Sequence, residues 1–358
     1  MRSFWVPGKP KEGRKEGILF VGNFLSESLG SHSVCEDLAL QMARLGWPVL
    51  TTSSKRNRFS RLFDMITATL RKRHGYKVAH VDVYSGPAFV YAELVCEILT
   101  LLKKPYILTL HGGNLPLFSD QWTCRVRRLL RSAAIVTTPS TYLMRKMCVY
   151  NDALQLLPNA LELELYEFRA RRNPRPRLIW LRAFHKMYNP NLAVKVLALL
   201  TEDLPDAHLT MIGPDKGDGT LETAIRMAAG MGVADRMTVI GAVPKSDVPC
   251  WLNDGDIFLN TTEVDNAPVS VPEAMACGLC VVSTNVGGIP YLLKDRENAL
   301  LVPPNSPESM ASAVRRIIDK AGLAASLSHN ARVEAEQHDG SIVYPRWERL
   351  FREVSSHA

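Results

Sequence analysis

Short apolar runs rich in β-branched residues alternate with amphipathic stretches along most of the chain, and this alternation restricts the possible folds more than any other feature. We expect the following runs to be strands: 18–22, 49–53, 78–84, 106–111 and 134–138, then 178–183, 208–213, 237–242, 257–262 and 279–284. Strands separated by helix-length segments are typical of parallel sheets with crossover helices. The sequence therefore predicts an α/β protein with two Rossmann-like domains.

A segment rich in arginine and proline, RARRNPRPR at 169–177, separates the two sets of strands. Its composition predicts a linker. We expect an amino-terminal domain at 1–170, a linker at 171–177, a carboxy-terminal domain at 178–335, and a final helix at 336–358 that can pack back on the amino-terminal domain. Open parallel sheets bind ligands beyond the carboxyl ends of their strands, so a cleft between the domains, closing around the linker, is the expected binding site.

Composition excludes several other classes of protein. A chain of 358 residues with 46% hydrophobic and 22% charged residues is too long for one ordinary core and is not disordered. It has no run of about 18 apolar residues that would span a membrane, and no signal-peptide pattern at its start. Seven scattered cysteines, an odd number, indicate reduced thiols. We therefore expect a cytoplasmic protein.

The net charge of +7 is unevenly divided, since residues 1–177 carry 27 Lys and Arg against 14 Asp and Glu, and the remainder carries 16 against 22. Much of the excess lies at 55–73, where an apolar stripe recurs at helical spacing: Phe59, Leu62, Phe63, Ile66 and Leu70. The segment is either a helix on an anionic membrane surface or an ordinary helix that packs this stripe on a sheet. Nucleic acid is not an expected partner, because no binding module accompanies the charge.

The segment 260–290 carries the densest set of polar side chains after a predicted strand. Ser270 and Glu273 have the spacing of a capping box, which would give Glu273 a purely structural role. A second interpretation is functional, because free amides at a helix start suit a sugar diphosphate. Asp265 precedes Glu273 by eight residues, so both carboxylates could accept hydrogen bonds from ligand hydroxyls.

This segment resembles the E-x7-E motif of the retaining GT-B glycosyltransferases of family 4 (glycosyl transferases group 1), here written Asp265-x7-Glu273 and followed by EAMACG and STNVGGIP. Other matches are Gly30 sixteen residues before Gly46, His111-Gly-Gly, Pro158-Asn-Ala-Leu-Glu, and Asn298-Ala-Leu-Leu-Val-Pro-Pro. The similarity extends over about residues 18–335. It implies a GT-B fold, with two Rossmann-like domains facing across a cleft.

The resemblance also implies roles for individual residues. Glu273 would bind the ribose of a nucleotide sugar, Asp265 the hydroxyls of the transferred sugar, and Arg182 with Lys186 the diphosphate. His111 would line the junction of sugar and acceptor. The implied donor-binding residues are Gly30, Gly213, Asn266, Ala267, Pro268, Val269 and Glu273; the implied catalytic residues are His111, Arg182, Lys186, Asp265 and Glu273.

The activity that the resemblance implies is retaining transfer from a nucleotide-sugar donor without a metal or other cofactor. The acceptor would be a glycan or a polyprenyl- or lipid-linked molecule, in the synthesis of cell-surface polysaccharide or glycoconjugates. The enzyme would be cytoplasmic and peripheral on the inner face of the plasma membrane. A nucleotide-sugar epimerase or hydrolase, and a non-catalytic sugar-nucleotide-binding regulator, are the alternatives.

The chain departs from the family pattern at four places. The first acid of the motif is Asp265 rather than Glu, Leu29 replaces a glycine, Lys186 lies one residue closer to Arg182 than usual, and Tyr291 stands where the family often has Glu. Two other motifs have simpler explanations. Asp254-Gly-Asp256 is expected to be a turn rather than a metal site, and Cys277-x-x-Cys280 to be two small buried residues.

Overall fold

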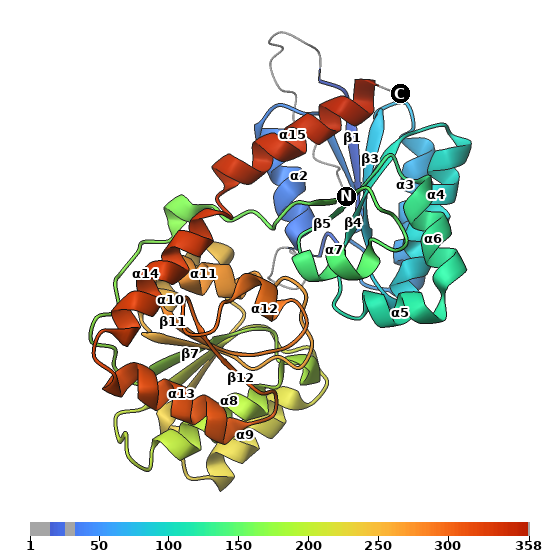
Figure 1. Ribbon diagram of the computed structural model, residues 1–358. Helices are drawn as coiled ribbons and strands as arrows, with labels where there is room; N and C mark the ends of the chain where they lie inside the picture. Colours follow the sequence, from blue (N-terminus) through green and yellow to red (C-terminus); the bar gives the residue numbers. More distant parts are fainter. Residues whose placement is uncertain (1–14, 26–32, 357–358) are drawn as a thin grey trace. The chain divides into compact units, whose positions relative to one another are not determined.

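A computed structural model describes residues 15–25 and 33–356 of the chain (Figure 1). It divides into two units, each with its own parallel sheet. Of the described residues, those up to Ala160 and those from Ser341 onward form the first unit. Leu161–Gly340 form the second. Two Rossmann-like domains are therefore confirmed.

The sheet of the first unit has six parallel strands in the order β2-β1-β3-β4-β5-β6. Their bounds are β1 Ile18–Val21, β2 Val49–Thr52, β3 Val78–Val83, β4 Tyr106–Leu110, β5 Ile135–Thr138 and β6 Leu154–Leu156. Apolar side chains on both sides of these strands are buried. Such burial is expected of a parallel sheet with helices on both faces.

Two groups of helices cover this sheet. One apolar cluster joins the sheet to α2 (Val34–Arg44) and α15 (Gly340–Ser356), with Trp347 and Phe351 of α15 packed near Phe20 of β1. A second cluster contains residues of the remaining helices: α3 Arg58–Arg71, α4 Phe89–Leu101, α5 Leu115–Gln121, α6 Thr123–Ser132 and α7 Thr141–Met147. The last helix is thus part of the core of the first unit.

The second unit repeats this architecture with the strand order β12-β11-β10-β7-β8-β9. Its strands are β7 Arg177–Leu181, β8 His208–Ile212, β9 Met237–Gly241, β10 Ile257–Asn260, β11 Cys280–Thr284 and β12 Leu300–Val302. Its helices are α8 Pro190–Leu200, α9 Thr220–Gly230, α10 Val248–Asn253, α11 Ser270–Ala276, α12 Ile289–Leu292, α13 Pro307–Asp319 and α14 Leu323–Glu336. One cluster lies under α8, α9 and α13, and the other under α10 and α11.

All ten predicted strands are present, with ends within two residues of the expected ones. The sequence did not predict β6 or β12, each of which has only three residues and lies at the end of its sheet. No helix within the described part of the chain is both long and apolar enough to cross a bilayer.

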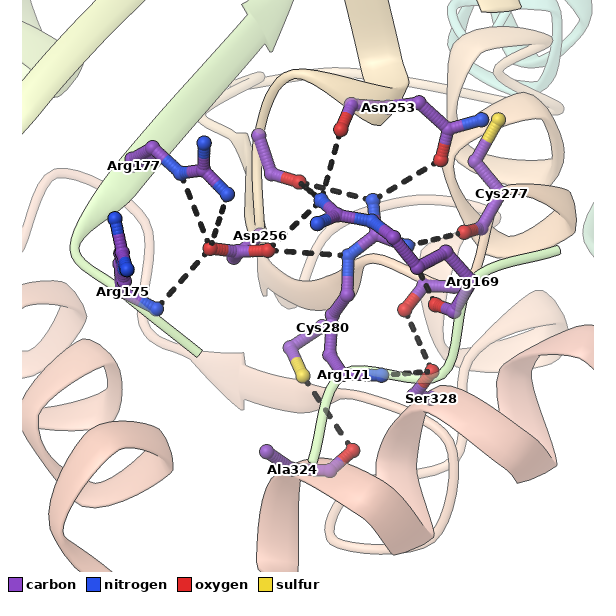
Figure 2. A network of polar contacts seen from close by, with 12 residues as sticks. Arg169, Arg171, Arg175, Arg177, Asn253, Asp256, Cys277, Cys280, Ala324 and Ser328 are labelled. Carbon is purple, nitrogen blue, oxygen red and sulfur yellow. Dashed lines mark hydrogen bonds and ion pairs between the residues drawn. The ribbon is translucent and has the colours of Figure 1, made fainter. Parts of the chain in front are cut away.

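The predicted domain boundary at residue 170 and the linker at 171–177 differ from the structure. The division falls after Ala160, and the arginine-rich segment belongs to the second unit. Figure 2 shows why: Asp256, next to β10, holds three of these arginines. Its carboxylate oxygens lie 3.0 Å from Nη2 of Arg169, 3.3 Å from Nε of Arg171 and 3.1 Å from Nη2 of Arg177.

Arg171 is the most deeply held member of this cluster, with 2% of its surface exposed. Its guanidinium donates to the carbonyl oxygens of Cys277 at 2.7 Å and Gly255 at 2.9 Å (Figure 2). Burial lowers the pKa of Arg171 to about 10, and the positive charge of Arg169 adds to this effect. The segment is therefore fixed in the second unit. Asp254-Gly-Asp256 is the predicted turn between α10 and β10, and Asp256 is in addition a buried ion-pair partner.

Candidate functional site

The carboxyl ends of two neighbouring strands in the second unit bring the predicted donor residues together. β7 and β10 are adjacent in the sheet. Arg182 follows the last residue of β7, and the loop after β10 leads through Asp265 to α11. Parallel strands end at the same edge of a sheet, where open α/β folds bind ligands. The topology thus explains why residues far apart in the sequence form one site.

Arg182 and Asp265 form an ion pair at this edge, between Nη2 of Arg182 and Oδ2 of Asp265. Their side chains are 13% and 11% exposed. The guanidinium also lies 4.6 Å from the centre of the Tyr188 ring, and the other Asp265 oxygen accepts from the amide of Asn266 at 2.9 Å. Burial lowers the pKa of Arg182, while Tyr188 and Glu273 oppose the shift. Both predicted residues are brought together, with opposite charges balanced.

The loop that carries Asp265 and Asn266 rests directly on the two glycines of STNVGGIP. The amide of Gly288 donates to the carbonyl oxygen of Asp265 at 2.9 Å. A Cβ atom at Gly287 would lie 2.1 Å from that same oxygen, and one at Gly288 would lie 1.8 Å from the carbonyl oxygen of Asn266. The paired glycines are therefore needed for the close approach of two backbone segments.

Glu273 does not cap α11, so the predicted capping box is wrong. The helix begins at Ser270, its N-cap residue Val269 has helical backbone angles, and no side-chain cap bond forms within the described chain. Glu273 is 6% exposed, and its Oε1 accepts a hydrogen bond of 2.9 Å from the hydroxyl of Tyr166. Sequence reasoning missed Tyr166, because 107 residues separate the two and no local pattern marks the contact.

Several buried polar atoms around this loop have no hydrogen-bond partner among the described residues. They are Nε of Arg182, Oδ1 of Asn266, Oγ of Ser270 and Oδ1 of Asn260. Asn266 is 8% exposed and Ser270 6%. Buried polar groups in proteins are almost always hydrogen-bonded. Because these atoms lie beside an Arg–Asp ion pair and a buried glutamate, they are what we expect of a binding site for a polar ligand.

Lys186 lies close by in the chain but differs in environment. It begins a short 3₁₀ turn, Lys186–Tyr188, and its side chain is exposed. The turn is held to the loop after β10, since the amide of Glu263 donates to the carbonyl of Met187 at 2.9 Å. The backbone amide of Lys186 donates to Asp218 at 2.9 Å. Lys186 thus lies on a fixed turn four residues after Arg182. Its exposed side chain is not part of the buried Arg182–Asp265 pair.

Gly213, a predicted donor-binding residue, follows β8 with a φ of 145°. A Cβ atom there would lie 1.9 Å from the carbonyl oxygen of Arg182. This glycine therefore has a packing role beneath Arg182, and donor contact remains a prediction. Ala267, Pro268 and Val269 complete the loop that enters α11. Gly30 and Leu29 lie outside the described residues.

His111 belongs to the first unit, directly after β4. Its Nε2 lies 3.0 Å from Oδ1 of Asp82, and its ring stacks on that of Tyr84 with centres 5.3 Å apart. Sequence reasoning missed Asp82. The signal was present, because His80 and Asp82 alternate with valines in the buried strand β3.

The two cysteines of the CxxC segment are free and buried, as predicted. Burial raises the pKa of Cys277 and of Cys280 to about 12. Thiols held in this state are poor nucleophiles and poor metal ligands, which agrees with a packing role.

Comparison with known proteins adds to this description. Residues 165–334 match the family model described as Glycosyl transferases group 1. One component of the phosphatidylinositol N-acetylglucosaminyltransferase of Arabidopsis thaliana is 37% identical over 103 residues, or 28% of this chain and 23% of the relative. A D-inositol 3-phosphate glycosyltransferase of Mycobacteroides abscessus is 30% identical over 142 residues, or 39% of this chain and 32% of the relative. The chain thus matches a third or less of the length of these two curated relatives.

Solved structures show the same fold over nearly the whole chain. Sucrose-phosphate synthase from Thermosynechococcus elongatus superposes with a TM-score of 0.78 at 16% identity, covering 96% of this chain and all of that one. Anabaena HepE in complex with UDP and glucose superposes with a TM-score of 0.74 at 15% identity, covering 94% and 100%.

The two Rossmann-like units and these superpositions show that the chain has the GT-B fold. Residues 165–334, somewhat less than half of the chain, are similar to the glycosyl transferases group 1 family.

Proposed function

We propose that the protein transfers a sugar, with retention of anomeric configuration and without a metal, from a nucleotide-diphosphate donor to a glycan or lipid-linked acceptor. The observation that carries this proposal is a set of buried polar atoms beside the Arg182–Asp265 pair and Glu273 that find no hydrogen-bond partner in the described part of the chain. The UDP and UDP-glucose named in the HepE structures of similar fold support a nucleotide-sugar donor.

In this mechanism the diphosphate is the leaving group, and its growing negative charge must be stabilised. Arg182 is fixed at the strand edge and Lys186 lies on the adjoining turn, so their cations can supply this stabilisation. The bond from the anomeric carbon to the diphosphate oxygen breaks, and the acceptor oxygen bonds to the same face of the sugar. The acceptor proton passes to the departing phosphate.

Neither carboxylate is assigned as a covalent nucleophile. Both oxygens of Asp265 already have partners, Arg182 and the amide of Asn266. Those contacts orient Asp265 as a hydrogen-bond acceptor for sugar hydroxyls. Glu273, held by Tyr166, would accept from the ribose hydroxyls.

The acceptor side of the proposal involves α3. Of the two interpretations of the apolar stripe, packing on the sheet is seen only in part, because Met65, Ala68 and Thr69 form the buried face and, of the stripe, Leu62 and Ile66 are half-buried. Phe59 is 85% exposed, Phe63 69% and Leu70 39%. Exposed aromatic side chains among basic residues complement an anionic lipid surface.

We therefore propose that the basic segment 55–73 places the enzyme on the inner face of the plasma membrane, beside a lipid-linked acceptor. Two relatives whose names include phosphatidylinositol support this choice. Vesicle sedimentation tests it: the protein should bind vesicles rich in phosphatidylglycerol and not those of phosphatidylcholine. Phe59→Ser with Phe63→Ser should weaken binding at least tenfold, and Leu101→Ser, an equally exposed control on α4, should not. Equal binding to both vesicle types would contradict the proposal.

The transfer reaction itself is tested by incubating the protein with UDP-, GDP- and ADP-sugars, with and without a membrane extract of glycolipids. A transferase releases nucleoside diphosphate only when acceptor is present, and labelled sugar appears in the lipid fraction. Free sugar without acceptor would indicate a hydrolase, and an altered nucleotide sugar an epimerase. Donor binding without turnover under any condition would indicate a regulator.

A further inference from the structure

The interior of the first unit contains a polar network that the proposed donor site does not explain. Its members are Cys35 at the start of α2, His80 and Asp82 on β3, and His111 after β4. The first three are buried, and the His111 side chain is 12% exposed. Ionisable side chains are rarely buried together without a function or mutual hydrogen bonds.

Asp82 is ionised in this network, and its carboxylate contacts the ring of His111. Burial alone would raise the pKa of Asp82, but its interactions with His111, which include the hydrogen bond from the ring, and with His80 outweigh burial, so the pKa lies below its usual value. The two atoms that bond are Nε2 of His111 and Oδ1 of Asp82, 3.0 Å apart. Because a carboxylate only accepts, Nε2 must carry the hydrogen.

His80 does not compete for this carboxylate. Its Nδ1 is 3.9 Å from Oδ1 of Asp82, whereas its Nε2 lies 2.7 Å from Oγ1 of Thr109. The Thr109 hydroxyl lies 2.8 Å from that of Thr137, which donates to the carbonyl of Leu108. Because Thr137 donates to Leu108, its oxygen accepts from the Thr109 hydroxyl, and the Thr109 oxygen in turn accepts from His80. Nε2 of His80 therefore carries the hydrogen of this bond. Burial lowers the pKa of His80 to about 4, and it is therefore neutral.

Cys35 and Gly22 complete the space around Asp82. Sγ of Cys35, Nδ1 of His80 and an Asp82 oxygen lie within 4.8 Å of one another, a spacing that a metal ion could use. Burial and the charge of Asp82 raise the pKa of the Cys35 thiol, which keeps it protonated. A Cβ atom at Gly22 would lie 2.9 Å from Oδ2 of Asp82. The backbone thus leaves just enough room for the carboxylate.

We propose that Asp82 is a positioning residue that holds His111 in its Nε2–H tautomer, so that Nδ1 carries the lone pair and accepts a hydrogen bond from a substrate hydroxyl. The stacked ring of Tyr84 limits rotation of the imidazole. An Asp–His pair of this kind fixes both the tautomer and the orientation of the ring. The role of Nδ1 toward substrate rests on the proposed transferase function, whereas the tautomer does not.

The tautomer can be measured without any assay of activity. Ring nitrogens of ¹⁵N-histidine-labelled protein are observed by NMR near pH 7.5, and the His111 signals among the nine histidines are assigned by their loss in His111→Gln. The wild type should show His111 protonated at Nε2. In Asp82→Asn the amide can donate to Nε2, so the Nδ1–H form should become populated.

Kinetics test the consequence for transfer. Asp82→Asn should lower kcat at least tenfold while the KM for the donor changes less than twofold. Thr137→Val, at the far end of the hydroxyl chain, is the matched control, because it also removes a buried polar group from this sheet. It should leave the His111 tautomer and kcat unchanged.

An Nδ1–H tautomer in the wild type, or an unchanged tautomer in Asp82→Asn, would overturn the proposal. Should Asp82→Asn fail to fold, the wild-type spectrum still decides the first point. If no donor and acceptor pair gives transfer, the proposed function fails by that result, whereas the spectrum continues to test the positioning of His111 separately.

Discussion

Tyr166 donates its hydroxyl hydrogen to Glu273 at 2.9 Å, and this bond joins the first residues of the second unit to its predicted donor site. Both residues are buried, with 3% and 6% of their surfaces exposed. The bond orients the carboxylate of Glu273, which in a capping box would instead have bonded to the backbone at the start of α11. Glu273 therefore lies at an edge of the sheet where other buried polar atoms have no hydrogen-bond partner among the described residues.

Removing the Tyr166 hydroxyl should weaken nucleotide binding without destroying it. A hydrogen bond to a charged group contributes about 1.5 kcal/mol or somewhat more, so Tyr166→Phe should reduce affinity for the preferred nucleoside diphosphate roughly tenfold. Isothermal titration calorimetry measures this change. Tyr106→Phe removes a buried hydroxyl from the first unit and should leave the affinity unchanged. Equal effects of the two variants would contradict a specific role for Tyr166.

The Arg182–Asp265 pair makes separate predictions for stability and for turnover. Arg182→Gln leaves a largely buried carboxylate without its cation, which should lower the free energy of unfolding by about 3 kcal/mol. Adding Asp265→Asn removes the unpaired charge and should restore most of that loss. Transfer should be lost in both variants, because neither retains the guanidinium. Chemical denaturation and a turnover assay measure the two effects; a double variant with normal turnover would exclude Arg182 from catalysis.

Gly288 should not tolerate a methyl group, even though its backbone angles are ordinary ones for any residue. In Gly288→Ala the new Cβ would overlap the carbonyl oxygen of Asn266, so the loop 265–269 must move. Nucleotide binding should fall at least tenfold. Gly230→Ala is the matched control, since no atom of the described residues lies within 4 Å of a Cβ at that helical position. Unchanged binding in Gly288→Ala would mean that the loop is not part of the donor site.

The roles that a motif gave to Asp265 and Glu273 stay predictions, whereas the sequence predicted the strands well because their alternation with helices is a local pattern. It failed where contacts join distant segments. The segment around Arg171 has the composition of an exposed linker, but Arg171 is buried through its contacts with Asp256 and the carbonyl oxygen of Cys277. The capping box failed because Val269 is already helical, a conformation set by a loop that rests on Gly287 and Gly288. Asp82 needed the pairing of β3 with β4 before its bond to His111 could be seen.

The neutral state of buried His80 predicts that the first unit is less stable in acid. Its pKa is about 4 in the folded protein and about 6.5 when exposed, mainly because of burial, with the charge of Asp82 opposing and that of His111 adding to the shift. Between these values the unfolded chain takes up a proton that the folded chain does not. Stability should therefore fall as the pH drops below about 6.5, by roughly 2 kcal/mol between pH 7.5 and pH 5.

Hydrogen exchange of the β3 amides, corrected for the intrinsic rate at each pH, measures this change. In His80→Gln the group that titrates is absent, so the difference between pH 7.5 and pH 5 should shrink by about that amount, whatever the variant costs in absolute stability. The same pH dependence in both proteins would contradict a neutral buried His80.

The central claim is that Glu273 and its neighbours bind a nucleotide-sugar donor. The most direct measurement is a thermal-unfolding panel of UDP, GDP, ADP and their sugars on the wild type, Glu273→Gln and the exposed control Glu222→Gln. A ligand at about 100 times its Kd adds about 2.7 kcal/mol to the stability of the folded state. One nucleotide should stabilise the wild type and Glu222→Gln and have little effect on Glu273→Gln. Equal stabilisation of all three proteins, or of none, would contradict the account.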